Sequence, residues 1–210
     1  KNSGEITLEL SNTEIDIAIC NPPYSRIIDK NKYLSLFEEI GFEACKRLKY
    51  VTADLLFLAF NLSLLKKGGQ LGIIVPDTLI TSSDFELFRE DILKYDIIAI
   101  IELPTNIFKK TEAKTYIIVL NNIISKSIST ELLCADKNGE IIDKLKILKS
   151  SLVKRMDYTF HSFKLNVSIK GLTLRELGAK IHRGRLSKKE LIKKGSSFFH
   201  TSSFDTQLFV

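Results

Sequence analysis

The chain has 210 residues, of which 44% are apolar and 27% are charged; this composition is typical of a folded globular protein and excludes a disordered chain. No apolar run reaches the roughly 18 residues that a membrane-spanning helix requires, so we expect no membrane span. The 3 cysteines are too few and too scattered for a disulfide framework or a metal cluster, and the 3 histidines stand alone. We therefore expect no metal and a reducing compartment, the cytoplasm.

The net charge of +6 is distributed unevenly along the chain. Residues 1–125 contain 14 basic and 17 acidic side chains, whereas residues 126–210 contain 17 basic and 8 acidic ones. This asymmetry favours two units, the second of which meets a polyanion. A lysine-rich solvated surface would produce the same charge without any partner, and charge alone does not separate the two interpretations.

Apolar runs and helical spacings alternate over the first 125 residues. Short β-branched runs typical of buried strands cover 15–20, 70–75, 97–103 and 115–120. Apolar residues at helical spacing predict helices over 33–49, 52–66 and 84–93. The alternation predicts an α/β fold with a mostly parallel sheet and helices on both faces. Because residues 104–113 are too few for a helical crossover, the last two strands should pair antiparallel.

The strand signals weaken after residue 122. There the sequence predicts a polar helix over 143–152, a short helix over 173–177 and a strand over 179–182. We therefore expect a first domain at 1–125 and a second, smaller α+β segment at 126–210.

The motif Asn21-Pro22-Pro23-Tyr24 follows the first predicted strand, and ligands of α/β sheets bind beyond the carboxyl ends of strands. Two prolines fix the backbone and remove N–H donors, so the Asn21 side-chain oxygen and the Pro22 carbonyl can accept from one amino group. Tyr24 offers a flat face for stacking. This combination suits the exocyclic amine of a planar base, whose lone pair it localises for attack on an electrophilic methyl group. A Pro-Pro turn with Tyr24 as a surface aromatic is the alternative.

Residues 16–25 resemble the catalytic motif of the N6-adenine DNA methyltransferases. The later motifs of type I modification subunits and of combined type II restriction–modification enzymes are similar, in order and spacing, to residues 53–60, 64–76, 101–108 and 115–120. The resemblance implies a partial Rossmann-like methyltransferase sheet from the catalytic strand onward, with an antiparallel last strand.

The same resemblance implies roles for individual residues. Asn21 and Pro22 would bind the amino group of a flipped adenine, and Tyr24, after Pro23, would stack on the base. Phe108 would lie against the other face of the base, although a core or hairpin aromatic fits that position equally well. Asp54 and Asp77 are interpreted as a helix-start and a loop carboxylate without a catalytic role.

The basic C-terminal part resembles the opening of a target-recognition domain, on residues 174–185 and 198–202. Residues 126–210 would then be a linker and the start of that domain, which contacts double-stranded DNA through phosphates and base edges. The candidate DNA-binding residues are Lys180, Arg183, Arg185, Lys188 and Lys189. Solvent-facing arginines beside a helix-capping Gly184 are the alternative.

The family's methyl donor is S-adenosylmethionine, whose site depends on a Gly-rich turn ahead of the catalytic motif. Here Gly4 is the only glycine before Asn21. We therefore expect residues 1–125 to be the C-terminal part of a methyltransferase catalytic domain. We also expect the chain as a whole to lack the donor-binding motif and to be inactive alone. The expected partners are double-stranded DNA and, in addition, either specificity or restriction subunits or the missing N-terminal half.

The predicted function is site-specific methylation of the adenine N6 amino group of DNA within a restriction–modification system. The alternative is a non-catalytic DNA-binding or complementing subunit. Methylation of protein or RNA through the same motif is disfavoured by the basic, recognition-like segment.

Overall fold

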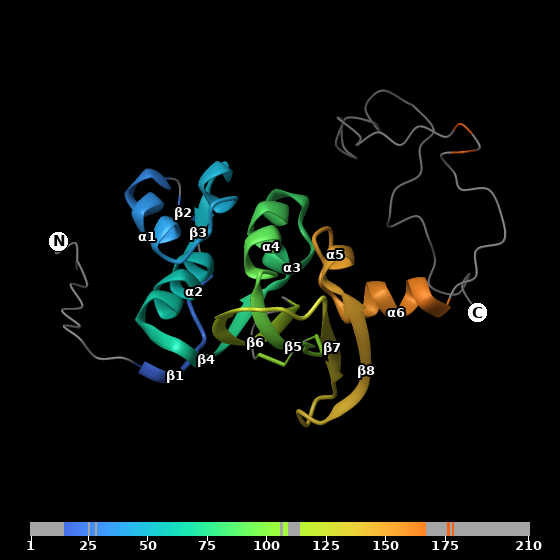
Figure 1. The fold of residues 1–210 in the computed structure, drawn as a ribbon. Coiled ribbons are helices and arrows are strands. Elements are labelled where there is room, and N and C mark those ends of the chain that lie inside the picture. The colour runs from blue at the N-terminus through green and yellow to red at the C-terminus, as the bar shows by residue number, and fades with distance from the viewer. Residues whose placement is uncertain are drawn as a thin grey trace. The chain divides into compact units, whose positions relative to one another are not determined.

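One six-stranded sheet organises the protein in its computed structural model, which describes residues 15–24, 26–27, 29–105, 107–108, 114–166, 176 and 178 (Figure 1). The strands are β1 (Ile15–Cys20), β4 (Leu65–Pro76), β5 (Tyr95–Glu102), β6 (Thr115–Ile124), β7 (Ser129–Ala135) and β8 (Ile141–Leu148). Their order is β1-β4-β6-β5-β7-β8. The expected antiparallel pairing of β5 with β6 is confirmed. The pairings β1–β4 and β5–β7 are parallel and the others antiparallel, so the sheet is mixed rather than mostly parallel.

Helices cover one face of this sheet in Figure 1. They are α1 (Leu34–Glu39), α2 (Ala53–Leu64), α3 (Asp77–Thr81) and α4 (Glu86–Ile92), with 3-10 turns η1 (Asn31–Tyr33), η2 (Cys45–Arg47) and η3 (Ser83–Phe85). The helix expected over 33–49 is interrupted because Gly41, at φ +72°, takes the left-handed conformation just after α1. α5 (Lys149–Leu152) and α6 (Tyr158–Asn166) follow β8.

The core lies between the helices and the sheet. Alternate residues of the central strands, among them Ile73 of β4 and Ile118 of β6, are fully buried there. On the opposite face, Ile17 and Ile19 of β1 are 63% and 85% exposed. Among the described residues, this face has apolar side chains without the covering helices that the sequence led us to expect.

The start of β4 depends on two glycines. Gly68 has a φ of +81°, which L side chains rarely adopt. A Cβ on Gly69 would lie 3.0 Å from the carbonyl oxygen of Ile15 and 3.0 Å from that of Lys66. Glycine at both positions therefore favours the path by which the chain leaves α2 and passes close to the start of β1.

The helix expected over 143–152 is wrong, because Ile141–Leu148 form strand β8 and only Lys149–Leu152 are helical. Leu145 and Ile147 alternate with lysines, which is strand periodicity. Between β7 and β8, Gly139 takes a φ of +85° after Asn138, a common hairpin signal.

The change of charge at residue 125 does not coincide with an edge of the sheet. β7 pairs with β5, so residues after 125 complete the same sheet, and the chain divides into compact units at 1–168 and 169–210. The helix and strand expected over 173–177 and 179–182 lie outside the described residues, apart from positions 176 and 178. In the part of the chain that is described, no helix is long and apolar enough to cross a membrane.

A buried guanidinium joins the segment after α5 to the helical layer. Arg89 of α4 is 0% exposed and donates hydrogen bonds of 2.6–2.9 Å to four backbone carbonyls, those of Leu79, Ser82, Val153 and Lys154. Burial lowers the pKa of Arg89 to about 10, so the side chain stays charged at neutral pH. The arginine thus fixes the end of the sheet domain to α3 and α4.

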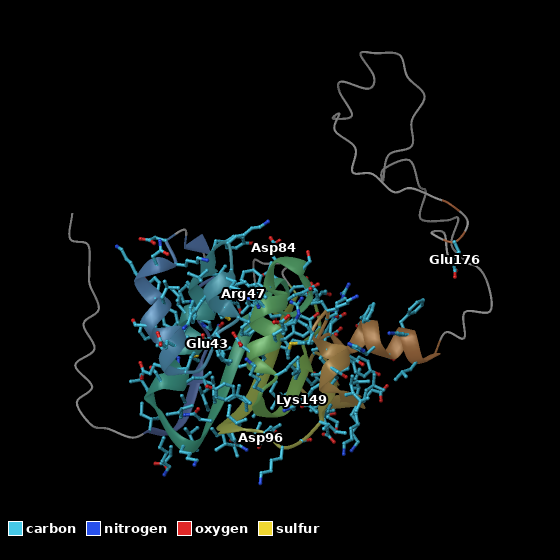
Figure 2. All side chains as sticks on the ribbon, turned by 45° about the horizontal axis from the view of Figure 1, so that its top comes forward. Glu43, Arg47, Asp84, Asp96, Lys149 and Glu176 are labelled. Atoms are coloured by element: carbon cyan, nitrogen blue, oxygen red, sulfur yellow. The ribbon has the colours of Figure 1, made fainter. Side chains whose placement is uncertain are left out.

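We expect Arg89→Met to lower the free energy of unfolding by on the order of 3 kcal/mol, because four buried carbonyls lose their donor. Urea denaturation followed by circular dichroism measures the change. Arg47→Met is the matched control, since Arg47 lies on the surface of the helical side and pairs only loosely with Glu90, at 3.7 Å (Figure 2). It should change the stability by less than about 0.5 kcal/mol. Equal effects of the two substitutions would contradict the structural role of Arg89.

Candidate functional site

The motif Asn21–Tyr24 leaves the sheet at the carboxyl end of β1, as predicted. Parallel pairing of Cys20 with Ile73 of β4 fixes the position at which the motif begins. Pro22 is buried, whereas Asn21, Pro23 and Tyr24 are exposed. The buried proline therefore anchors a turn in which the polar side chains of Asn21 and Tyr24 remain accessible to a ligand.

A second, small sheet holds the chain just beyond the motif. β2 (Arg26–Ile27) pairs antiparallel with β3 (Val51–Thr52), and β3 leads directly into α2. Both ends of the motif are therefore tied to regular structure, and its Tyr24 end lies beside the start of α2.

Tyr24 and Asn21 contact each other directly. The Tyr24 hydroxyl donates a hydrogen bond of 3.4 Å to Asn21 Oδ1, the same oxygen that could accept from an amino group. Tyr24 is 42% exposed, so its ring is accessible for stacking. Partial burial and the nearby Asp54 carboxylate raise the pKa of Tyr24, which keeps its hydroxyl protonated.

Asp54, in the first turn of α2, is a buried carboxylate near Tyr24 to which the sequence analysis assigned no catalytic role. It is 1% exposed, and its Oδ2 has no hydrogen-bond partner among the described residues. Burial raises the pKa of this carboxyl, and hydrogen bonds from its own backbone N–H and from the Thr52 side chain offset part of the rise. The one signal in the sequence was a carboxylate among apolar residues at the start of a helix. Such a carboxylate is ordinarily explained by its favourable interaction with the helix N-terminus.

An apolar pocket of about 530 Å³ begins at Asn21 and follows the exposed face of the sheet. Its polar side chains are those of Asn21 and Gln70, and its other lining residues are Ile17, Ile19, Cys20, Gly72, Ile73, Ile74, Ile101, Ile117 and Val119. S-adenosylmethionine carries a carboxylate, an amino group and ribose hydroxyls. The described residues of this pocket include no charged partner for them, so they do not fit the complete donor.

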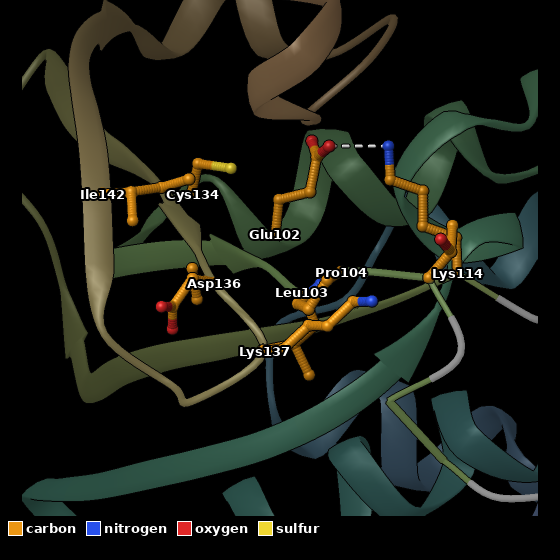
Figure 3. A pocket seen from close by; sticks show the side chains of 10 residues that line it. Glu102, Leu103, Pro104, Lys114, Cys134, Asp136, Lys137 and Ile142 are labelled. Atoms are coloured by element: carbon orange, nitrogen blue, oxygen red, sulfur yellow. Dashed lines mark ion pairs between the residues drawn. The ribbon is translucent and has the colours of Figure 1, made fainter.

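Phe108 lies in the connection between β5 and β6 and is half-buried. Among the described residues, it makes no ring contact with Tyr24, so the structure does not bring the two predicted base-stacking aromatics into contact. An ion pair closes the base of this connection: Lys114 Nζ lies 2.6 Å from Glu102 in a pocket of about 420 Å³ (Figure 3). Glu102 also accepts from the Thr159 backbone N–H at 3.0 Å, which connects the start of α6 to the end of β5.

The predicted DNA-binding residues Lys180, Arg183, Arg185, Lys188 and Lys189 lie outside the described residues. In the part of the chain that is described, no group of three or more His, Cys, Asp or Glu side chains could hold a metal ion.

The fold and the position of the motif define an α/β chain with a polar turn at the carboxyl end of its first strand. A sequence model of the family described as N-6 DNA Methylase matches residues 3–180. The chain therefore belongs to the N-6 DNA methylase family. No curated protein sequence matches it significantly.

Solved structures share the fold. The type IIG restriction endonuclease BpuSI is 18% identical with a TM-score of 0.53, covering 67% of this chain and 20% of that one. The methyltransferase subunit of a type I restriction-modification system from Streptococcus thermophilus is 21% identical with a TM-score of 0.51, covering 79% of this chain and 35% of that one. A nuclease-deletion mutant of the Type ISP restriction-modification enzyme LlaGI, in complex with a DNA substrate mimic, is 16% identical with a TM-score of 0.53, covering 70% and 19%. This chain thus spans between about a fifth and a third of the length of these proteins.

Proposed function

We propose that this chain supplies the target-base site of a restriction–modification methyltransferase that methylates the N6 amino group of adenine in DNA, with S-adenosylmethionine as methyl donor. The observation that carries the proposal is the Asn21–Tyr24 turn at the carboxyl end of β1, in a member of the N-6 DNA methylase family. The DNA-bound relative of the same fold gives further support.

The chain's own contribution is to hold the amino group. The prolines restrict the backbone that carries two acceptors, Asn21 Oδ1 and the Pro22 carbonyl, so the two amino hydrogens can each find a partner. Hydrogen bonds donated to two fixed acceptors pull the amine away from conjugation with the ring and make its lone pair a better nucleophile. Tyr24, and Phe108 on the other face, would hold the base by stacking.

A flipped base is required because the amino group is otherwise paired inside the duplex. We propose that residues 126–210 include the linker and the start of a target-recognition domain, and that the basic cluster at 180–189 contacts the duplex. The cluster's positive charge supports contacts with DNA phosphates. Specificity or restriction subunits are the further partners we propose.

Asn21→Ala should remove most of the preference for an amino group. We expect the wild-type chain to bind 2′-deoxyadenosine roughly tenfold more tightly than purine 2′-deoxyriboside, which lacks that group, and the variant to keep roughly a threefold preference through the Pro22 carbonyl. Titrations followed by ¹H–¹⁵N NMR measure both affinities. Asn31→Ala, at an exposed position of η1, is the control and should keep the full preference. Equal binding of both nucleosides by the wild-type chain would contradict the proposed base site.

We expect the 210 residues alone not to transfer a methyl group, because they provide the acceptor site while the described pocket lacks partners for the donor. The measurement is incorporation of tritium from labelled S-adenosylmethionine into mixed-sequence duplex DNA. Incorporation above the level without protein, abolished by Asn21→Ala, would show that the chain is active unaided.

Replacing the basic cluster should weaken DNA binding and its salt dependence together. For the combined variant Lys188→Gln and Lys189→Gln, we expect the slope of log K against log salt to fall by roughly 0.9 for each DNA phosphate that the variant no longer neutralises. Fluorescence anisotropy with a labelled duplex at several salt concentrations measures it. Lys144→Gln with Lys146→Gln, at exposed positions of β8, is the control of equal charge. If both pairs change the slope equally, the proposed DNA-binding role of residues 180–189 is wrong.

A further inference from the structure

Tyr24 takes up the acceptor that the proposed base needs. Its hydroxyl donates to Asn21 Oδ1 at 3.4 Å, and the same oxygen is the proposed acceptor for the adenine amino group. While this hydrogen bond is in place, the adenine amino group must compete with the Tyr24 hydroxyl for Asn21 Oδ1. The bond is long and therefore weak, so an incoming amino group can displace the hydroxyl at small cost. After displacement, the hydroxyl needs another acceptor if it is to remain out of bulk water.

The carboxyl group of Asp54 is a second acceptor near Tyr24. The residue is only 1% exposed, yet Oδ2 has no hydrogen-bond partner among the described residues. Buried oxygens without a hydrogen-bond partner are rare in native proteins, because each lowers the free energy of unfolding. An unpaired oxygen in the base-free protein is explained if that oxygen accepts a hydrogen bond when the base is bound.

The backbone brings this carboxylate to the tyrosine. β3 ends at Thr52 and pairs with β2, which begins only two residues after Tyr24, so the N-terminal turn of α2 lies beside the motif. Burial and, after it, the Asp54 charge raise the pKa of the Tyr24 hydroxyl, which marks the two groups as electrostatic neighbours. The Tyr24 side chain is partly exposed, so solvent leaves it room to reorient.

We propose that Asp54 is a positioning residue for Tyr24: its Oδ2 accepts the hydrogen bond of the Tyr24 hydroxyl when the amino group of the target base takes Asn21 Oδ1. One hydrogen bond is exchanged for another, and no proton is transferred. The new bond holds the ring against the face of the base. This inference rests on the proposed function, since it requires a base with an amino group in the site.

The test separates a positioning role from a structural one by two readouts on the same variants. Asp54→Leu removes the acceptor, so we expect the affinity for 2′-deoxyadenosine, measured by NMR titration, to fall roughly fivefold through the absence of one hydrogen bond. The same variant should unfold at a higher temperature, because an unpaired buried carboxylate is replaced by an apolar side chain. Asp54→Asn keeps an acceptor in place and should bind within about twofold of the wild type.

A double-mutant cycle with Tyr24→Phe identifies the partner. The phenylalanine keeps the stacking surface but has no hydroxyl, so adding Asp54→Leu to Tyr24→Phe should weaken binding no further. Thr115→Val is the matched control: Thr115 Oγ1 is also buried without a partner among the described residues, in β6, and its removal should leave base binding unchanged.

Three outcomes would overturn the inference: unchanged binding by Asp54→Leu, an equal loss with and without the Tyr24 hydroxyl, or a loss in Asp54→Asn as large as in Asp54→Leu. Each presupposes that the wild-type chain prefers 2′-deoxyadenosine to purine 2′-deoxyriboside and that Asn21→Ala reduces this preference. Absence of that preference would instead contradict the proposed function. A failure of the proposed function can therefore be distinguished from a failure of the inference on Asp54.

Discussion

The candidate site depends on a turn that is tied down at both ends. On one side, β1 pairs in parallel with β4, where Gly69 allows the two backbones to approach so closely that a Cβ would crowd the carbonyl oxygens of β1. On the other side, the short pairing of β2 with β3 returns the chain to the start of α2. Between these two anchors lie only a few residues, one of them the buried Pro22. Fixed ends leave the turn few conformations, which keeps the entropic cost of ordering two acceptors around an amino group low.

The rest of the sheet positions a second turn at the same edge. β6 runs antiparallel between β4 and β5, so the connection from β5 into β6, which carries Phe108, lies at the carboxyl end of β5. Glu102 and Lys114 close the base of that connection, and Glu102 also accepts from the backbone at the start of α6. The end of β5 is thereby joined to α6, the last described helix of the sheet domain.

The sequence predicted those features that depend on short-range patterns. The apolar run Ile15–Cys20 and its proline stop indicated the bounds of β1, and a ten-residue connection sufficed to predict antiparallel pairing of β5 with β6. Helical spacing did not reveal that Gly41 ends α1, since periodicity continues across a left-handed glycine. β8 was assigned to a helix because its lysines suggested a polar helix, while the decisive alternation of Leu145 and Ile147 extends over few residues. The roles of Lys180 to Lys189 remain predictions.

Asp54 could not have been found from the sequence, for a physical reason. A carboxylate in the first turn of a helix is normally explained by the helix dipole and the unpaired N–H groups there. Its burial depends instead on tertiary packing, namely a two-residue strand pairing that brings the motif over the start of α2. Strands this short have no periodicity to detect. A buried oxygen left without a partner is a local conflict of the kind that proteins retain at functional sites, where a loss of stability in the free state is recovered when a ligand binds.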